Sequence, residues 1–329
     1  WLLLITILVA LIIIVGGLTR LTDSGLSITR WGLISGILPP FTNSEWEKTF
    51  SLYKKIPEYQ LQNFSMTLNE FKVIFWWEFS HRMLGRILGI FYIIPLIFFT
   101  LKFKISKKLI ISFYLIFILI LIQGFIGWYM VSSGLDDAID VSHYRLSLHL
   151  TLAFVIFILL LWNFIKYTDK EKYIIQKRLS LFLPNIFFLL LIIQISVGAL
   201  VSGLDGGQIY QSWPLMNGNY FPDDSFFSDL FSKESLSTPS LVQFLHRSLA
   251  YIIFFLFLVI FLFIFKKEEY SYLRKSTLIV SFFLLLQIFL GILTILSGAQ
   301  ILIASMHQIG SILLITSTLI LVFKNSKIS

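Results

Sequence analysis

The sequence predicts an all-α integral membrane protein with eight transmembrane helices, arranged as two tandem four-helix bundles. Of the 329 residues, 57% are hydrophobic and 13% are charged, and the mean hydropathy is +0.85. About a quarter of the residues of a typical soluble domain are charged, so this composition indicates a membrane protein. The apolar residues form runs of about twenty, which cross a hydrocarbon core of roughly 30 Å as helices. These runs lack the alternation that transmembrane β-strands require.

The boundaries of these runs can be placed in order along the chain. The first run begins at Trp1 rather than Met and lacks a small-residue cleavage site, so we expect a retained helix rather than a signal peptide. Thr67-x-x-Glu70 fits a capping box and predicts that the second helix begins there, which puts His81 about 13 residues, or roughly 20 Å, into it. Ser44-x-x-Glu47 fits another box and predicts an interfacial helix in the first loop. The predicted spans are residues 1–18, 74–101, 109–131, 146–165, 181–201, 242–265, 276–297 and 301–323.

The distribution of basic residues predicts the topology. The net charge is +8, and fifteen Lys and Arg residues lie in the short connections 102–108, 166–180 and 266–275 and in the tail 324–329. By the positive-inside rule, these segments and both termini face the cytoplasm or the mitochondrial matrix. The charge therefore reflects topology rather than nucleic-acid binding. Because the chain has no cysteine, disulfides, thiolate ligation and iron–sulfur clusters are excluded.

The two halves of the chain resemble each other. "EFSHRMLG" at 78–85 is similar to "QFLHRSLA" at 243–250. Each half holds an even number of predicted spans, so both copies have the same orientation in the membrane. We predict an N-terminal four-helix half over residues 1–170 and a C-terminal half over residues 171–329, each with a site in its core. A Gln-x-x-x-Gly pattern also recurs near the outer ends of three odd-numbered spans, at 123–127, 194–198 and 287–291.

Four of the five histidines occupy equivalent places. His143 lies in a predicted loop, where solvent exposure is expected. The others fall near the outer ends of the even-numbered spans: His81, His149, His246 and His307. A lone histidine in an apolar helix usually makes a structural hydrogen bond, but four at similar depth, two per half, indicate ligands. Two per half do not complete a zinc site unless the halves share one, whereas two imidazoles on facing helices suit the axial positions of a haem.

The residues around these histidines fit a flat macrocycle that carries carboxylates. A small residue stands one helical turn after each histidine: Gly85, Ala153, Ala250 and Ser311. Positions i and i+4 share a face, so these residues give clearance, although helix packing also selects small residues. The candidates for propionate contacts are Arg82, Arg86, Arg145 and Arg247. Snorkelling, or an ion pair between Glu78 and Arg82, would also account for such arginines.

The halves differ in one carboxyl group. Glu78 lies on the same helix face as His81, and its counterpart in the C-terminal half is Gln243. A carboxyl can shuttle protons and an amide cannot. Arg145 likewise corresponds to the apolar Ile303. The first site is therefore equipped for chemistry and the second for holding a cofactor.

Several stretches, taken together, match a known family. They are "GGLTRLTDSGLS" at 16–27, "PEYQLQN" at 57–63, "FKVIFWWEFSHRMLGR" at 71–86, "VSHYRLSLHL" at 141–150, "GLDGG" at 203–207, "PLMNG" at 214–218 and "VQFLHR" at 242–247. The chain resembles haem A synthase, in its cysteine-free proteobacterial and mitochondrial form, over essentially its whole length. The resemblance implies eight helices, a four-helix duplication, and the oxidation of a methyl group of haem O to the formyl group of haem A.

The resemblance also implies roles for the site residues. His81 and His149 would bind the iron of the substrate haem O, and Glu78 would be the catalytic acid and base. His246 and His307 would bind a haem b that passes electrons away. Substrate would come from haem O synthase, and product would go to the terminal cytochrome oxidase and its assembly machinery, in the bacterial or mitochondrial inner membrane. A homo-oligomer is compatible with this reading.

Two other functions fit parts of the sequence. A bis-histidine cytochrome that keeps two haems b for electron transfer accounts for the histidines nearly as well as the synthase does. A transporter would account for the repeat and the intramembrane charges. The predicted spans, however, lack the midplane Gly and Pro breaks typical of transporters.

Overall fold

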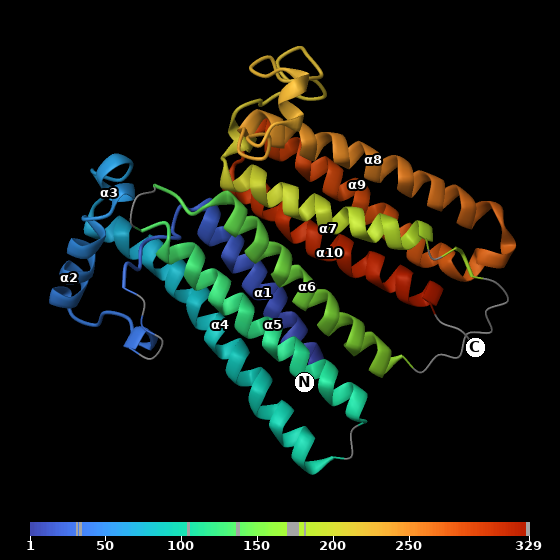
Figure 1. Cartoon of the computed structure of the whole chain (residues 1–329), viewed down its shortest axis with the longest axis horizontal. Coiled ribbons are helices and arrows are strands. Elements are labelled where there is room, and N and C mark those ends of the chain that lie inside the picture. Colours follow the sequence, from blue (N-terminus) through green and yellow to red (C-terminus); the bar gives the residue numbers. More distant parts are fainter. Residues whose placement is uncertain are drawn as a thin grey trace. The chain divides into compact units, whose positions relative to one another are not determined.

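The computed structural model describes residues 1–30, 32, 35–103, 106–135, 139–169, 178–180 and 182–326. Within these residues the chain is helical and forms no β-strand, so the predicted all-α fold class is confirmed. Eight helices are long and apolar enough to cross a membrane, which confirms the predicted multi-pass membrane protein (Figure 1).

Each predicted span overlaps one of these long helices. They are α1 (Leu2–Leu21), α4 (Leu68–Lys102), α5 (Lys107–Ser132), α6 (His143–Thr168), α7 (Phe182–Gly203), α8 (Pro239–Lys266), α9 (Arg274–Leu296) and α10 (Ile301–Ser326). The shorter elements are η1 (Ser35–Ile37), α2 (Asn43–Tyr53), α3 (Pro57–Leu61), η2 (Gly206–Gln208), η3 (Phe227–Phe231) and η4 (Glu268–Leu273). Several long helices extend a turn or more beyond the apolar runs, because helical hydrogen bonding continues into polar turns that hydropathy does not count.

Capping boxes begin two of the helices in the first loop. The predicted box of Thr67 and Glu70 is confirmed: the Glu70 carboxylate accepts from Thr67 N at 2.7 Å. The predicted box at Ser44 is wrong, because α2 is capped two residues earlier by Thr42, whose amide donates to Glu45 Oε2 at 2.9 Å. The Thr42 hydroxyl accepts from Glu45 N at 3.2 Å, which satisfies a backbone donor in the first turn of α2.

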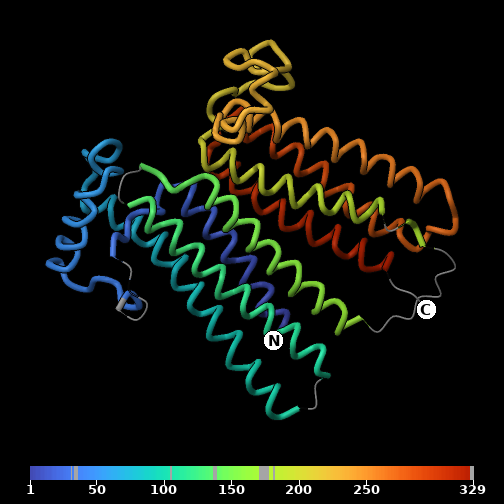
Figure 2. The backbone as a smooth tube through the Cα atoms, viewed as in Figure 1, coloured from blue at the N-terminus to red at the C-terminus, as the bar shows by residue number. Residues whose placement is uncertain are grey.

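The described chain forms two compact units, one of residues 3–157 and the other of residues 158–329. In the second unit, α7 packs against α8 and α10, and α9 packs against the same two helices, which closes a ring of four. The loop between α7 and α8 gathers at the end of this unit where α7 ends (Figure 2). The predicted boundary between residues 170 and 171 lies outside the described residues, so the two tandem bundles remain a prediction.

An aromatic cap covers the first turns of α4 in the first unit. Helices α2 and α3 lie beside these turns (Figure 1). We use "aromatic cap" for this cluster of buried residues: Leu26, Trp46, Phe50, Tyr53, Ile56, Phe71, Ile74, Phe75 and Val141. Phe50 and Phe71 stack at 5.0 Å between ring centroids, and Trp46 and Phe75 meet edge to face at 4.9 Å. Aromatic pairs of this kind add to the free energy gained by burial, so the cap holds the first turns of α4 in place.

Candidate functional site

His81 on α4 and His149 on α6 face each other in the first unit. Their ring centroids are 6.4 Å apart, and the ring planes meet at 77°. Two imidazoles that bind one metal from opposite sides, each with about 2 Å between nitrogen and metal, have centroids roughly 6 Å apart. The described residues contain no group of three or more His, Cys, Asp or Glu side chains placed to hold a bare metal ion. The distance between the two rings is therefore compatible with two histidine ligands on one metal.

All four histidine rings of the even-numbered spans rest against a glycine of the preceding span. A Cβ built on that glycine would stand 2.7 to 3.0 Å from the imidazole Cε1. The pairs are Gly16 with His81, Gly127 with His149, Gly198 with His246, and Gly291 with His307. Any larger residue would displace the ring, so glycine is required by this close approach. The recurring Gln-x-x-x-Gly pattern contained three of these four glycines, but their contact with the histidines was not predicted.

A glutamine side chain of the preceding span hydrogen-bonds to the backbone of three of the four histidines. Each Nε2 donates to the backbone carbonyl of a histidine: Gln123 to His149 at 2.9 Å, Gln194 to His246 at 3.0 Å and Gln287 to His307 at 3.0 Å. Gln and Gly one turn apart share a helix face, so one face of each odd-numbered span anchors the histidine backbone and leaves room for its ring. The recurring Gln-x-x-x-Gly pattern thus positions a histidine of the next span, through its backbone and its ring. At His81 the apolar Ile12 stands where the glutamine would be.

The small residues after the histidines have different surroundings. A Cβ at Gly85 would meet no atom within 4 Å, so this position faces open space beside His81 rather than a packed helix. At Gly310, next to Ser311, a Cβ would stand 2.3 Å from Gln287 Oε1, so helix contact explains that glycine. Close packing accounts for Gly310, whereas Gly85 is exposed and packs against no other helix.

Glu78 is buried and fully hydrogen-bonded. The loop segment of residues 22–30 after α1, which we call the first strap, lies over it. Ser27 Oγ and Ile28 N both donate to Glu78 Oε2 at 2.7 Å. Arg82 Nε donates to the other oxygen at 3.0 Å, and the guanidinium forms an ion pair with it. Arg82 also donates to the Ile28 carbonyl at 3.2 Å. The hydrogen bonds between this strap and Glu78 were not predicted from the sequence.

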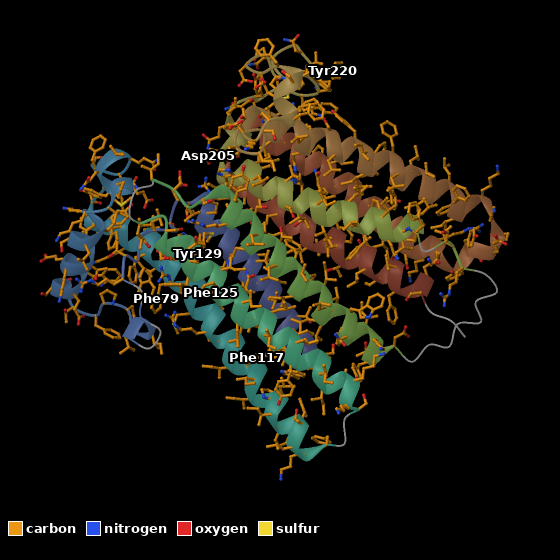
Figure 3. All side chains as sticks on the ribbon, in the orientation of Figure 1. Phe79, Phe117, Phe125, Tyr129, Asp205 and Tyr220 are labelled. Carbon is orange, nitrogen blue, oxygen red and sulfur yellow. The ribbon has the colours of Figure 1, made fainter. Side chains whose placement is uncertain are left out.

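A second strap, residues 204–212 after α7, makes the corresponding contacts in the second unit. Arg247 donates to the carbonyls of Tyr210 at 2.8 Å and Ser212 at 2.9 Å. Gln243 donates through Nε2 to the Tyr210 carbonyl at 3.3 Å. Both straps begin with an aspartate of positive φ, Asp23 at 47° and Asp205 at 50°. Asp205 is labelled in Figure 3. Aspartate tolerates this left-handed conformation better than most residues.

The remaining arginines are bound to protein groups. Arg86 donates to the Gly32 carbonyl at 3.1 Å. Arg145 lies over the ring of Tyr129 at 4.3 Å and hydrogen-bonds with Ser133 (Tyr129 is labelled in Figure 3). His143 is not in a loop as predicted: it is the first residue of α6 and is half-buried, with its ring 4.2 Å from that of Tyr144.

Comparisons with known proteins show the family to which the chain belongs. The family COX15-CtaA, described as cytochrome oxidase assembly protein, matches residues 1–319. A relative from Pelagibacter ubique (strain HTCC1062), named "Heme A synthase", is 50% identical over 99% of this chain and 96% of its own length. Relatives of the same name from Rickettsia bellii (strain OSU 85-389) and Maricaulis maris (strain MCS10) are 42% and 40% identical, over 96% and 95% of this chain and 94% and 92% of their own lengths.

Proposed function

The chain belongs to the COX15-CtaA family of cytochrome oxidase assembly proteins, and from this premise we propose that it oxidises haem O to haem A. The reaction converts a ring methyl group into a formyl group through successive oxidations of the methyl carbon. The observation that carries the proposal is a buried carboxyl, Glu78, three residues before a histidine that faces a second histidine. The other half of the chain has an amide in its place.

In the first unit, His81 and His149 bind the iron of the substrate. The 6.4 Å between their ring centroids supports this assignment. The open space at Gly85 gives the flat substrate room beside His81. Glu78 is the acid and base that takes protons from the substrate. Its side chain is held by the first strap and by Arg82, so its position is set before substrate binds.

In the second unit, His246 and His307 hold a haem b. Two observations support the fit: both rings rest against a glycine, and the Nδ1 atom of each is buried without a hydrogen-bond partner among the described residues. A ring nitrogen is thus left for a ligand. A haem bound there would supply one-electron chemistry. The protein's part is to seat the two histidines through Gln194 and Gln287.

The arginines recognise the propionates of the two haems. Arg82, Arg86, Arg145 and Arg247 all lie on the histidine-bearing spans. A guanidinium has five N–H donors in a planar arrangement that matches a carboxylate, which supports this assignment.

The cellular setting follows from the family and the charge distribution. Haem O synthase supplies the substrate, and the assembly machinery of cytochrome oxidase receives the product. The protein lies in the bacterial or mitochondrial inner membrane, with both termini on the cytoplasmic or matrix side. We also propose a homo-oligomer, which the mass of the purified complex would test.

The replacement Glu78→Gln tests the assignment. The amide keeps the shape of the carboxyl but cannot transfer a proton, so we expect haem A formation to fall at least about a hundredfold. Haem content of the purified protein is measured by mass and by absorption spectrum, and Glu47→Gln, an exposed residue of α2, is the matched control. Normal accumulation of haem A in the Glu78 variant would rule out this acid–base role. Purified protein that holds haem b, and never haem O or haem A, would instead indicate an electron-transfer cytochrome.

A further inference from the structure

Glu58 is a buried carboxyl group with no part in the proposed reaction. It lies in the first turn of α3, directly after Pro57, and only 3% of it is exposed. Helix α3 and the adjoining α2 lie beside the start of α4 (Figure 1). The aromatic cap thus keeps this carboxyl from water, although the helix that carries it has only five residues.

One oxygen of Glu58 has a partner and the other has none. The hydroxyl of the buried Tyr53 hydrogen-bonds with Glu58, and Asn63 Nδ2 donates to the Tyr53 oxygen at 2.8 Å. Among the described residues, no donor reaches Glu58 Oε2. A buried polar atom without a hydrogen bond costs free energy. A purely structural role for Glu58 leaves this cost unexplained.

The charges of other segments that act on Glu58 are those of carboxylates. They are Asp140 before α6, Glu78 on α4 and Asp23 in the first strap. The nearby ammonium of Lys54 lies over the aromatic rings of the cap, 4.3 Å from one ring centroid. The carboxyl thus lies among other acids, with Tyr53 as its hydrogen-bond donor.

These carboxyls differ in their access to water. The side chain of Asp23 is 63% exposed, Asp140 is half-buried, and Glu58 and Glu78 are each 3% exposed. Burial, and then the charges of the neighbouring carboxylates, raise the pKa of Glu58 to about 8. A group with such a pKa gains and loses a proton readily near neutral pH.

We propose that Glu58 carries protons from Glu78 to the outer aqueous side of the membrane. The inference rests on the proposed function, in which oxidation of the methyl carbon removes hydrogen from the substrate and Glu78 takes up the protons. In the transfer, the O–H bond of Glu78 breaks, an O–H bond forms at Glu58, and no electrons move. Glu58 then releases the proton past Asp140 or Asp23. It does not touch the substrate, so it acts through Glu78.

The replacement Glu58→Gln distinguishes a proton carrier from a structural group. Glutamine has the shape and charge of protonated glutamate, so a structural role survives the change and a carrier role does not. We expect kcat for haem A formation to fall on the order of tenfold, less than the hundredfold expected for a direct acid–base group. KM for haem O should stay unchanged, and the step in kcat near pH 8 should disappear. Glu47→Gln should match the wild type at every pH.

Two results would overturn the proposal. One is a Glu58→Gln protein whose kcat follows the wild-type pH profile. The other needs no variant: infrared titration of the wild-type protein between pH 6 and 10 that shows no protonated carboxyl losing its proton. The second measurement decides the matter if the variant does not fold. Failure of the proposed function is recognised separately, because wild type would then make no haem A while the infrared titration could still be read.

Discussion

The two straps follow the same path but meet side chains of opposite hydrogen-bonding character. Each begins at a left-handed aspartate, and the fifth residue after it, Ile28 or Tyr210, offers its carbonyl to the arginine that follows a histidine. In the first strap, Ser27 and the next backbone N–H donate to a carboxylate. In the second strap, a carbonyl accepts from an amide.

Glu78 and its donor Ser27 are both present in the first half, and both are absent from the corresponding places in the second half. Ser27 lies four residues after Asp23, and the residue at the same place after Asp205 is Ile209, which has no hydroxyl. The half that carries Gln243 has therefore lost both the carboxyl and the side chain that holds it. The shared scaffold seats a histidine and an arginine in both halves. The strap decides what stands beside them.

The largest effect is expected from exchanging the two side chains. The double replacement Glu78→Gln with Gln243→Glu should lower haem A formation at least about a hundredfold rather than move it to the other half. The second strap faces the new carboxylate with the Tyr210 carbonyl, an acceptor, and has Ile209 rather than a serine at the place of Ser27. Haem A formation in membranes is the measurement. Activity near that of the wild type would show that the halves are interchangeable.

A smaller, half-specific effect is expected at the glycines. In Gly16→Ala the new methyl group would stand 2.7 Å from the ring of His81, and in Gly198→Ala it would stand 2.9 Å from that of His246. The ring must shift, so haem bound in that half should fall about tenfold or more while the other half keeps its haem. Quantitative haem extraction gives the content of each. Loss of both haems from one replacement would mean that the halves are not independent.

The hydroxyl of the first strap should have a moderate effect. Ser27→Ala removes one of the donors to Glu78, and we expect kcat to fall about tenfold, which corresponds to about 1.4 kcal/mol. Ser24→Ala is the matched control, since this buried serine of the same strap hydrogen-bonds with Thr22 and not with Glu78. Equal losses in the two variants would indicate a general loosening of the strap.

The smallest effect concerns stability against pH. The pKa of Glu58 is raised from 4.5 to about 8, so between these values the folded protein keeps a proton that the unfolded chain has lost. The free energy of unfolding therefore decreases as pH rises through this window. The Glu58→Gln protein does not lose stability in this way. The difference between its Tm in detergent and that of the wild type should therefore increase from pH 5 to pH 8. A constant difference would mean that Glu58 is ionised throughout. The second strap, residues 204–212, contains no buried carboxyl group.

Local patterns predicted the helices and the histidines but not the straps. Hydropathy finds a membrane span because about twenty residues in sequence share one property, and Thr67 caps α4 through a contact three residues away. The bond between Ser27 and Glu78 joins residues 51 apart in sequence, and no local pattern encodes it. Two capping boxes of equal spacing overlap at the start of α2, so spacing alone does not choose between Thr42 and Ser44. The burial of Glu58 depends on tertiary packing of the cap.

The contact between a glycine and a histidine is repeated within each half of the chain as well as between the halves. Each contact joins an odd-numbered span to the next even-numbered one, with 2.7 to 3.0 Å between the added Cβ and the imidazole Cε1. One pair of successive spans therefore supplies one imidazole. A haem held by two histidines would need two such pairs, so four spans are the smallest part of this chain that could hold one.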